Sequence, residues 1–306
     1  MKRIAVLALM LLSCSFVCCG AELPVPEKVI GAKTVAVVSL NLVEIKKDAL
    51  FKSITTVVGE APDAAAVKQF DDLDAKIKAS GATSLSFVLS IPKGSDIAKS
   101  SDNSILVVEM KEGADNTKVA DLLYELIPGI KTEKADDCPK EIEGALVWYK
   151  KGHKLPVANK ERAEAFSGAY EQVGEHQSIS IVLMPDEDAV ESAKASLKPE
   201  EKELVSAILD GDGICLFCNL GVSAEPSVKL LIMAADAAGA EKLSKTAQAL
   251  IDQFKKELPP PMAPLMDTLK LVQAGTNVQL SLAFPEITKA AKDLMAAMAP
   301  PPPASK

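Results

Sequence analysis

The residues best suited to catalysis are two histidines and the serines of the chain. A serine hydrolase needs a nucleophile, a histidine that accepts its proton and an acid that orients the histidine. His153 lies in a predicted hairpin turn and His176 in a polar loop, and no Gly-x-Ser-x-Gly elbow occurs. We therefore expect both histidines to be solvated, with a weak site between them as the alternative.

Three cysteines lie outside the N-terminal segment, and two of them have a spacing found in zinc and redox motifs. In a strand, residues three apart face opposite sides, so Cys215 and Cys218 should neither share a metal nor bond to each other. A redox pair would instead lie at a helix N-terminus. With Cys138 the number is odd, so we expect buried thiols and at most one disulfide.

Other motifs point to no cofactor and no metal. Asp210 to Gly213 resembles part of a calcium loop, but the remaining carboxylates and the closing glutamate are missing, which favours a simple turn. No phosphate-binding glycine pattern occurs either. The sequence therefore predicts no catalytic, cofactor-binding or metal-binding residues.

Serines alternate with apolar residues in two predicted strands. Ser84, Ser86 and Ser90 do so in the first half, and Ser178 and Ser180 in the second. Alternation places such hydroxyls on one side of a strand, where they could line a polar binding face. The favoured interpretation is the solvated side of an antiparallel sheet.

The N-terminus has the features of a secretory signal. Lys2 and Arg3 precede an apolar run at 4–12, which is too short to span a membrane, since a spanning helix needs ~20 residues. Ordinary cleavage after Ala21 is favoured, and lipidation of Cys14 is the alternative. Both routes predict export to the bacterial periplasm or cell envelope, with membrane contact only through a lipidated Cys14.

Composition excludes some partners and permits a substantial core. Hydrophobic residues make up 48% of the 306 residues and charged residues 25%, as in globular proteins. The net charge is −8 and aromatic residues make up 4%, so the chain lacks the basic patches and ring platforms that bind nucleic acids. We expect no nucleic-acid partner.

Hydrophobic periodicity predicts alternating strands and helices in both halves of the chain. In the first half we expect strands at 34–40, 84–91 and 104–110, helices at 42–58, 62–80 and 116–127, and a hairpin of 145–149 with 155–158 around Gly152. In the second half we expect strands at 178–184, 214–220 and 228–234, helices from Asp186, from Pro199 and at 240–258, a hairpin around Gly275, and a last helix ending near Met298.

The similar order of elements in the halves predicts an α+β fold with internal duplication. Each half would be a βαββαβ, ferredoxin-like module with an antiparallel sheet packed on helices. Short connections predict antiparallel pairs of 84–91 with 104–110 and of 214–220 with 228–234. The helices that begin near Asn116 and Gly239 should cover the same relative face in each half. The predicted organisation is a signal peptide at 1–21, a linker at 22–32, modules at 33–160 and 161–299, and a Pro-rich tail at 300–306. Chance alignment of alternating elements is the alternative.

The segment 34–41 followed by Leu50-Phe51-Lys52, together with the Gly275 hairpin, resembles uncharacterised exported proteins of Planctomycetes-type bacteria. The resemblance implies an exported location and supplies no site residues. The favoured hypothesis is a non-enzymatic binding or structural module of the cell envelope, whose partner is an unidentified envelope protein or ligand. The alternative is an exported hydrolase with an unrecognised site.

Overall fold

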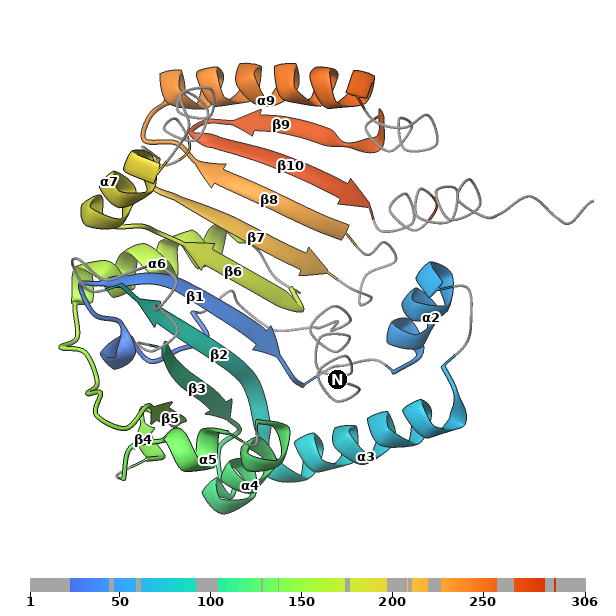
Figure 1. Cartoon of the computed structure of the whole chain (residues 1–306), viewed down its shortest axis with the longest axis vertical. Coiled ribbons are helices and arrows are strands. Elements are labelled where there is room, and N and C mark those ends of the chain that lie inside the picture. The colour runs from blue at the N-terminus through green and yellow to red at the C-terminus, as the bar shows by residue number, and fades with distance from the viewer. Residues whose placement is uncertain are drawn as a thin grey trace, which may run out of the picture.

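A computed structural model describes residues 23–43, 47–58, 62–91, 104–127, 129–136, 138–173, 177–196, 208, 211–219, 227–257, 267–283 and 289. These residues form an α+β fold, as predicted, built on one antiparallel sheet (Figure 1). The predicted signal at 1–21, Cys14, the helix from Pro199, the last helix and the Pro-rich tail lie outside the described residues.

Ten strands form the sheet, in the order β4-β5-β3-β2-β1-β6-β7-β8-β10-β9. The predicted pairing of the strands at 84–91 and 104–110 is confirmed, and so is that of the strands at 214–220 and 228–234. The strands are β1 (Thr34–Asn41), β2 (Ala82–Ser90), β3 (Ser104–Met110), β4 (Lys140–Ile142), β5 (Ala145–Tyr149), β6 (Ile179–Leu183), β7 (Gly213–Asn219), β8 (Ser227–Met233), β9 (Lys270–Ala274) and β10 (Asn277–Ala283).

The two predicted modules share this sheet instead of forming two separate sheets. β1 pairs with β2 on one side and with β6 on the other, so the first strand of each half lies at the centre. In two separate sheets, β1 and β6 would each lie at an edge and expose unpaired N–H and C=O groups. The pairing of β1 with β6 removes both of these edges. Counted outward from the centre, the first, second and third strands of each half are followed by its fifth strand and then its fourth.

The helices largely follow their predicted positions. Asp63 caps the N-terminus of α3 by accepting from Ala66 N, and Gly81 ends it in a left-handed conformation. The helices are η1 (Glu27–Val29), α2 (Lys47–Val58), α3 (Ala64–Ser80), α4 (Asn116–Leu126), α5 (Ile130–Glu133), α6 (Lys160–Val173), α7 (Glu187–Ser196) and α9 (Ala237–Glu257).

Besides the short helices η1 and α5, which were not predicted, the structure differs from the prediction at β5 and at α6. β5 forms its hairpin with β4 across Glu143-Gly144, and not with the segment 155–158, because both turn residues have the positive φ that a two-residue hairpin turn requires. Helix α6 was not predicted, although Asn159 caps it by accepting from Arg162 N, and Phe166 is fully buried. Its stripe is built mainly from alanines, which makes the periodicity weak.

One face of the sheet, which we call the apolar face, carries a continuous row of hydrophobic residues. Each member pairs with the next on the neighbouring strand, so the row crosses nine of the ten strands. From β5 to β9 the row consists of Trp148, Leu106, Phe87, Val38, Ile181, Leu216, Leu230, Leu280 and Leu271.

The opposite face, which we call the serine face, is buried at its centre, so the prediction of a solvated serine side is wrong. Ser86 and Ser180 are 0% and 3% exposed. Ser86 Oγ donates to Pro24 O at 3.1 Å and lies 2.9 Å from Ser39 Oγ, while Ser180 Oγ lies 3.2 Å from Tyr170 Oη. These hydroxyls stay buried because each has a hydrogen-bond partner.

Residues 23–32, expected as a linker, help to cover the serine face. Val25, Val29 and Ile30 are buried in the main hydrophobic core, and Asn159 N donates to Ile30 O. On this side of the sheet α6 packs on β6 and β7. The first described residues are therefore part of the core and not a free connection.

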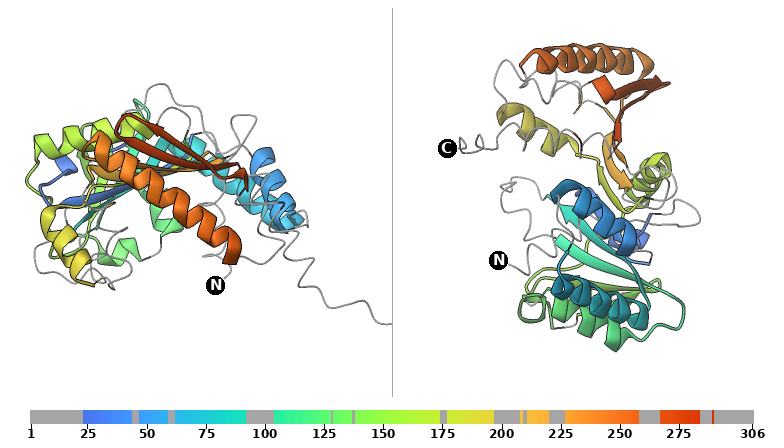
Figure 2. Two further views of the ribbon diagram at one scale, coloured as in Figure 1. Left: turned by 90° about the horizontal axis from the view of Figure 1, so that it is seen from above. Right: turned by 90° about the vertical axis from the view of Figure 1, so that its right-hand side faces the viewer.

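Helices cover the two ends of the apolar face. Helices α4 and α5 lie in front of the first-half strands and α9 beside β9 and β10, while α6 lies behind the sheet (Figures 1 and 2). Leu122 and Leu123 of α4 are buried, and Leu243 of α9 packs with Val278 of β10. The two helices thus cover the same face, as predicted from their matching places in the two halves.

Candidate ligand pocket and ion cluster

The residues that the sequence offered for chemistry do not form a described site. His153 is half-buried in a turn, where its N–H donates to Lys150 O, and His176 lies outside the described residues. Asp212 is exposed and its N–H donates to Met233 O, while Asp210 lies outside the described residues. In the described part of the chain, no group of three or more His, Cys, Asp or Glu is placed to hold a metal ion.

Cys138 and Cys215 are buried thiols that form no disulfide. Cys215 is 0% exposed and Cys138 is 5% exposed. Cys215 pairs with Val182 and Cys218 with Ile179, so the register places the two on opposite faces of β7. Burial raises the pKa of the Cys215 thiol to about 12, which leaves almost no thiolate to act as a nucleophile or a ligand at neutral pH.

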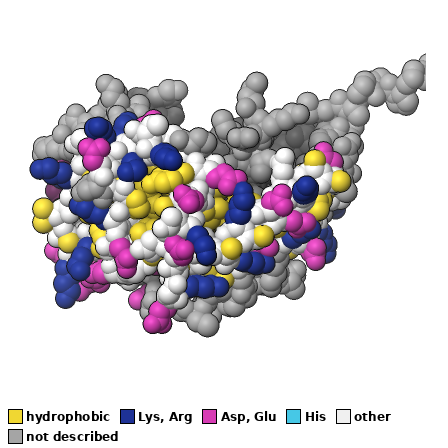
Figure 3. All heavy atoms as spheres, turned by 90° about the horizontal axis from the view of Figure 1, so that it is seen from below, with side chains coloured by type: hydrophobic (Ala, Val, Ile, Leu, Met, Phe, Trp, Pro, Cys, Tyr) yellow, Lys and Arg dark blue, Asp and Glu magenta, His cyan; other side chains and the backbone are white. Residues whose placement is uncertain are grey.

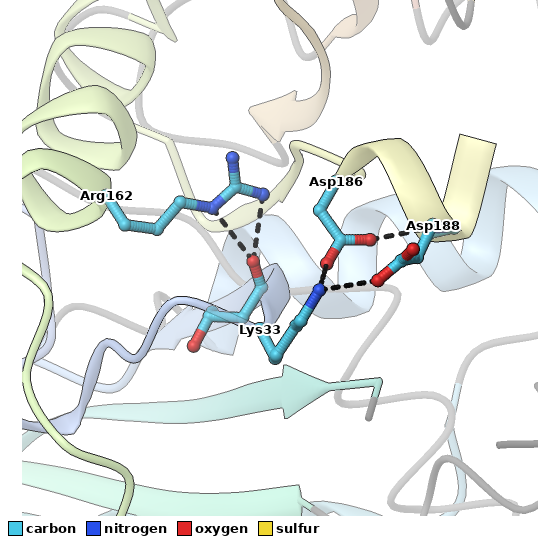
Figure 4. Close-up of polar contacts among 6 residues, drawn as sticks. Lys33, Arg162, Asp186 and Asp188 are labelled. Carbon is cyan, nitrogen blue, oxygen red and sulfur yellow. Dashed lines mark hydrogen bonds and ion pairs between the residues drawn. The ribbon is translucent and has the colours of Figure 1, made fainter. Parts of the chain in front are cut away.

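Four charged residues gather where β1 begins, next to α6 and α7 (Figure 4). Lys33 Nζ lies 2.8 Å from Asp186 and 2.8 Å from Asp188, and hydrogen bonds to these carboxylates raise the pKa of Lys33. Arg162 donates from both Nε and Nη2 to Thr34 O, at 3.0 and 2.9 Å.

This ion cluster connects the two halves of the chain. Lys33 belongs to the first half, and the other three residues belong to the second. Asp186 also accepts from Ala189 N, so one carboxylate caps α7 and holds Lys33. Arg162 additionally stacks on Phe166, and burial lowers the pKa of its guanidinium. Because every charged group has a structural partner, the cluster is best understood as an attachment between the halves.

A pocket of about 420 Å³ lies between the apolar face and the α4–α5 segment. Its wall on the sheet side includes Phe87, Leu106 and Trp148, which are consecutive members of the hydrophobic row. Ile127 and Ile130 line the opposite wall. This volume falls within the range of roughly 300–1,000 Å³ found for small-molecule sites.

The pocket exists because the covering helix of the first half is short. α4 ends at Leu126 and the chain turns into α5, whereas α9 continues for 21 residues along the second half. At the corresponding strand of that half, Leu230 packs against the core beneath α9. The interruption of α4 therefore leaves a space over the sheet that a longer helix would fill.

Trp148 combines burial with an unpaired donor. The side chain is 1% exposed, and among the described residues its indole Nε1 is a buried polar atom without a hydrogen-bond partner. Most buried polar groups in proteins have a partner, and an unpaired one costs about 1–3 kcal/mol. The accessible surface of Nε1 is below 1 Å², so other atoms of the Trp148 side chain or backbone line the pocket.

Polar residues complete the lining. Lys134 Nζ donates to Cys138 O at 2.6 Å, so its ammonium group already has a backbone partner. Glu133 is exposed, and Lys150 also lines the pocket. Seen from the side that carries α3, α4 and α5, hydrophobic side chains gather in an area flanked by charges of both signs (Figure 3).

A second pocket of about 450 Å³ lies beside the N-terminal segment and is more polar. It is lined in part by Val25, Glu27, Glu109 and Glu143. Glu143 pairs with Lys28 and Glu109 accepts from Ser84, so two of these carboxylates have protein partners. This arrangement gives no reason to assign a ligand.

Sequence reasoning missed the pocket because its walls are distant in sequence and meet only in the folded sheet. The one local signal was the end of the 116–127 helix, which was predicted. Helices in the described residues include none that is both long and apolar enough to cross a membrane. Comparison with known protein families, curated proteins and solved structures finds no match to this chain.

Proposed function

We propose that the protein is a non-enzymatic binding module, exported to the cell envelope, that holds a small apolar ligand in the pocket beneath α5. The observation that carries this proposal is the pocket between the hydrophobic row of the sheet, at Phe87, Leu106 and Trp148, and the α4–α5 segment. Concave, mostly apolar pockets with few polar groups are the usual form of small-molecule sites. The buried thiols and the paired ion cluster supply no competing chemistry among the described residues.

The test uses the fluorescence of Trp148, the only tryptophan in the chain. The neutral apolar probe N-phenyl-1-naphthylamine absorbs where tryptophan emits, so binding in the pocket should quench Trp148 by energy transfer. Replacing Ile130 with Phe should reduce the affinity about tenfold, because the larger ring occupies the space. Val272→Phe is the control, since Val272 is 52% exposed on β9, at the far edge of the sheet.

The proposal fails if the probe does not quench Trp148, or if both variants bind it as the native chain does. Circular dichroism of each variant shows that loss of binding is not loss of folding. A reduction confined to Ile130→Phe places the probe in the pocket and not at the exposed apolar positions elsewhere.

Export is supported by the predicted signal and by the position of the first packed residues. Pro24 and Val25 are buried, so cleavage after Ala21 would leave only two residues before the packed chain. Lipidation of Cys14 would leave a tether of nine residues before Leu23. The mass of the mature N-terminal peptide from native cells decides between them, and retention of Met1 would contradict both.

We also propose that the halves arose by duplication. In support, the outward strand order is β1-β2-β3-β5-β4 in one half and β6-β7-β8-β10-β9 in the other. α4 follows β3 and α9 follows β8, each on the apolar face. Superposition of the two halves tests this: opposite strand directions at equivalent positions would show convergence of two unrelated units.

A further inference from the structure

We propose that the chain forms a two-fold symmetric dimer in which the edge strand β9 pairs antiparallel with β9 of a second copy, centred on Val272. β9 is the outermost strand of the described sheet, at the end away from the pocket (Figure 1). The inference therefore goes beyond the proposed function and does not depend on ligand binding. An edge strand with unpaired backbone groups is a template for pairing with another chain.

The hydrogen bonds of the sheet determine which backbone groups of β9 face outward. Ala234 N donates to Thr276 O, so the backbone groups of Thr276 face β8. This direction alternates along β10, and Leu271 and Gln273 lie opposite β10 residues that also face β8. The N–H and C=O groups of Leu271 and Gln273 therefore point away from the sheet. Among the described residues, no hydrogen bond outside the β9–β10 ladder reaches them.

The side chains of β9 are accessible, unlike the opposite edge of the sheet. Four of the five residues of β9 are exposed, and Val272 is 52% exposed. The opposite edge strand, β4, has only three residues, and Lys140 and Glu141 give it charges of both signs. Short, charged edge strands resist pairing with other chains. β9 is longer, and Lys270 is its single charged residue, so β9 is the edge suited to pairing.

A two-fold axis at Val272 makes β9 complementary to itself. Leu271 of each copy then lies opposite Gln273 of the other, so all the outward N–H and C=O groups of these residues form hydrogen bonds. The two Val272 side chains meet in a non-hydrogen-bonded pair, where cross-strand side chains are closest. Lys270 lies opposite Ala274, so no like charges face each other. This self-complementarity favours a second copy over an unrelated extended peptide.

Helix α9 leaves room for this pairing. Leu243 of α9 and Leu271 of β9 belong to the same cluster on the apolar face, whereas Val272 points to the other side of the sheet. α9 contacts both β9 and β10. The two α9 helices of a dimer would therefore lie about two strand spacings apart, roughly 10 Å, which is the normal distance between packed helices.

Charge substitutions at Val272 test both the surface and the register. Size-exclusion chromatography with light scattering should show the mature chain as a dimer. Val272→Asp and Val272→Lys should each be monomeric, because two like charges would lie opposite each other at the axis. A mixture of the two variants should form a heterodimer, since opposite charges then meet.

A proline substitution tests the backbone pairing by itself. Gln273→Pro removes an outward N–H and leaves the β9–β10 ladder intact, as is tolerated in edge strands. It should weaken the dimer at least about tenfold, because each copy loses one inter-strand hydrogen bond. Gln273→Thr is the matched control, which retains the N–H and should retain the dimer. Circular dichroism shows whether each variant is folded.

Three results would overturn the proposal. The first is a mature chain that is monomeric even at its highest soluble concentration. The second is a dimer that neither Val272→Asp nor Gln273→Pro weakens, because such a dimer uses another surface. The third is a mixture of the two charge variants that stays monomeric, because Val272 would then not lie opposite itself.

Discussion

At the scale of single residues, burial determines whether a reactive group can react. Cys215 is a nucleophile by type, yet it lies between strand neighbours beneath α6, and its Sγ is 3.7 Å from Ala169 O. Desolvation disfavours the thiolate, so the pKa of the thiol is raised to about 12. Burial likewise leaves the Trp148 indole N–H without water and without a protein partner.

The raised pKa of Cys215 predicts a loss of stability at alkaline pH. The thiol of the unfolded chain ionises near its ordinary value of 9.0, whereas the folded protein retains the proton until about pH 12. Above pH 9 the unfolded state therefore binds fewer protons, and the free energy of unfolding should fall by up to about 1.4 kcal/mol per pH unit.

Urea unfolding at neutral pH and on both sides of pH 9 measures this dependence. The Cys215→Ala variant should lose the contribution of this thiol, although it will be less stable at neutral pH because of the cavity. Equal alkaline slopes in the two proteins would show that Cys215 keeps an ordinary pKa when folded.

At the scale of elements, helix ends determine where the chain can turn. Gly81 ends α3 with φ of 82°, and a Cβ atom built there would lie 2.8 Å from Ala114 Cβ. Gly113 also has a positive φ, 75°, but open space surrounds the position of its Cβ. Comparing alanine variants at the two positions therefore separates the free-energy cost of backbone strain from that of the steric contact.

We expect Gly81→Ala to be more destabilising than Gly113→Ala. Backbone strain alone should cost each variant about 1 kcal/mol, and the contact with Ala114 should add at least about 1 kcal/mol to Gly81→Ala. Chemical denaturation of both variants measures the difference. If the two lose equal stability, the β3–α4 loop moves at little cost and the close approach at Ala114 is not a constraint.

At the scale of the whole molecule, the two halves are joined through the sheet and at the ion cluster where β1 begins. β1 pairs with β6, Lys33 binds Asp186 and Asp188, and Arg162 donates to Thr34 O. The core that includes Val37 also includes Val182, so hydrophobic packing continues across the boundary. We therefore expect the halves to unfold together.

Replacing Val182 with Asp should destabilise both halves. Val182 is 0% exposed and pairs with Val37, so an unpaired carboxylate there should lower the free energy of unfolding by at least about 3 kcal/mol. Trp148 fluorescence reports the first half, and hydrogen exchange of α9 reports the second. The free energies of unfolding obtained from the two probes should fall by similar amounts.

Leu183→Asp is the matched control, because this neighbour in β6 is 37% exposed and faces the other side of the sheet. Its effect should be much smaller. If Val182→Asp increases exchange in α9 while the midpoint measured by Trp148 is unchanged, the two halves are independent units and the shared sheet is not cooperative.

Local patterns in the sequence were enough to predict most elements and several of their pairings. Valine-rich runs, a proline and aspartate before a helix, and glycine after it act over a few residues, so β1, α3 and the Gly275 hairpin follow from them. Short connections also predicted the antiparallel pairs β2–β3 and β7–β8. For the candidate site, only the end of the helix at α4 could be predicted, and not the pocket beside it.

Only the tertiary structure decided what these elements bury. The serines of β2 and β6 look solvent-facing by alternation, yet residues 23–32 and α6 cover them, and no local pattern records which distant segment supplies that cover. The pairing of β1 with β6 likewise joins strands more than a hundred residues apart. The Trp148 pocket has the same origin, since strand pairing aligns Phe87, Leu106 and Trp148, and the early end of α4 leaves space above them.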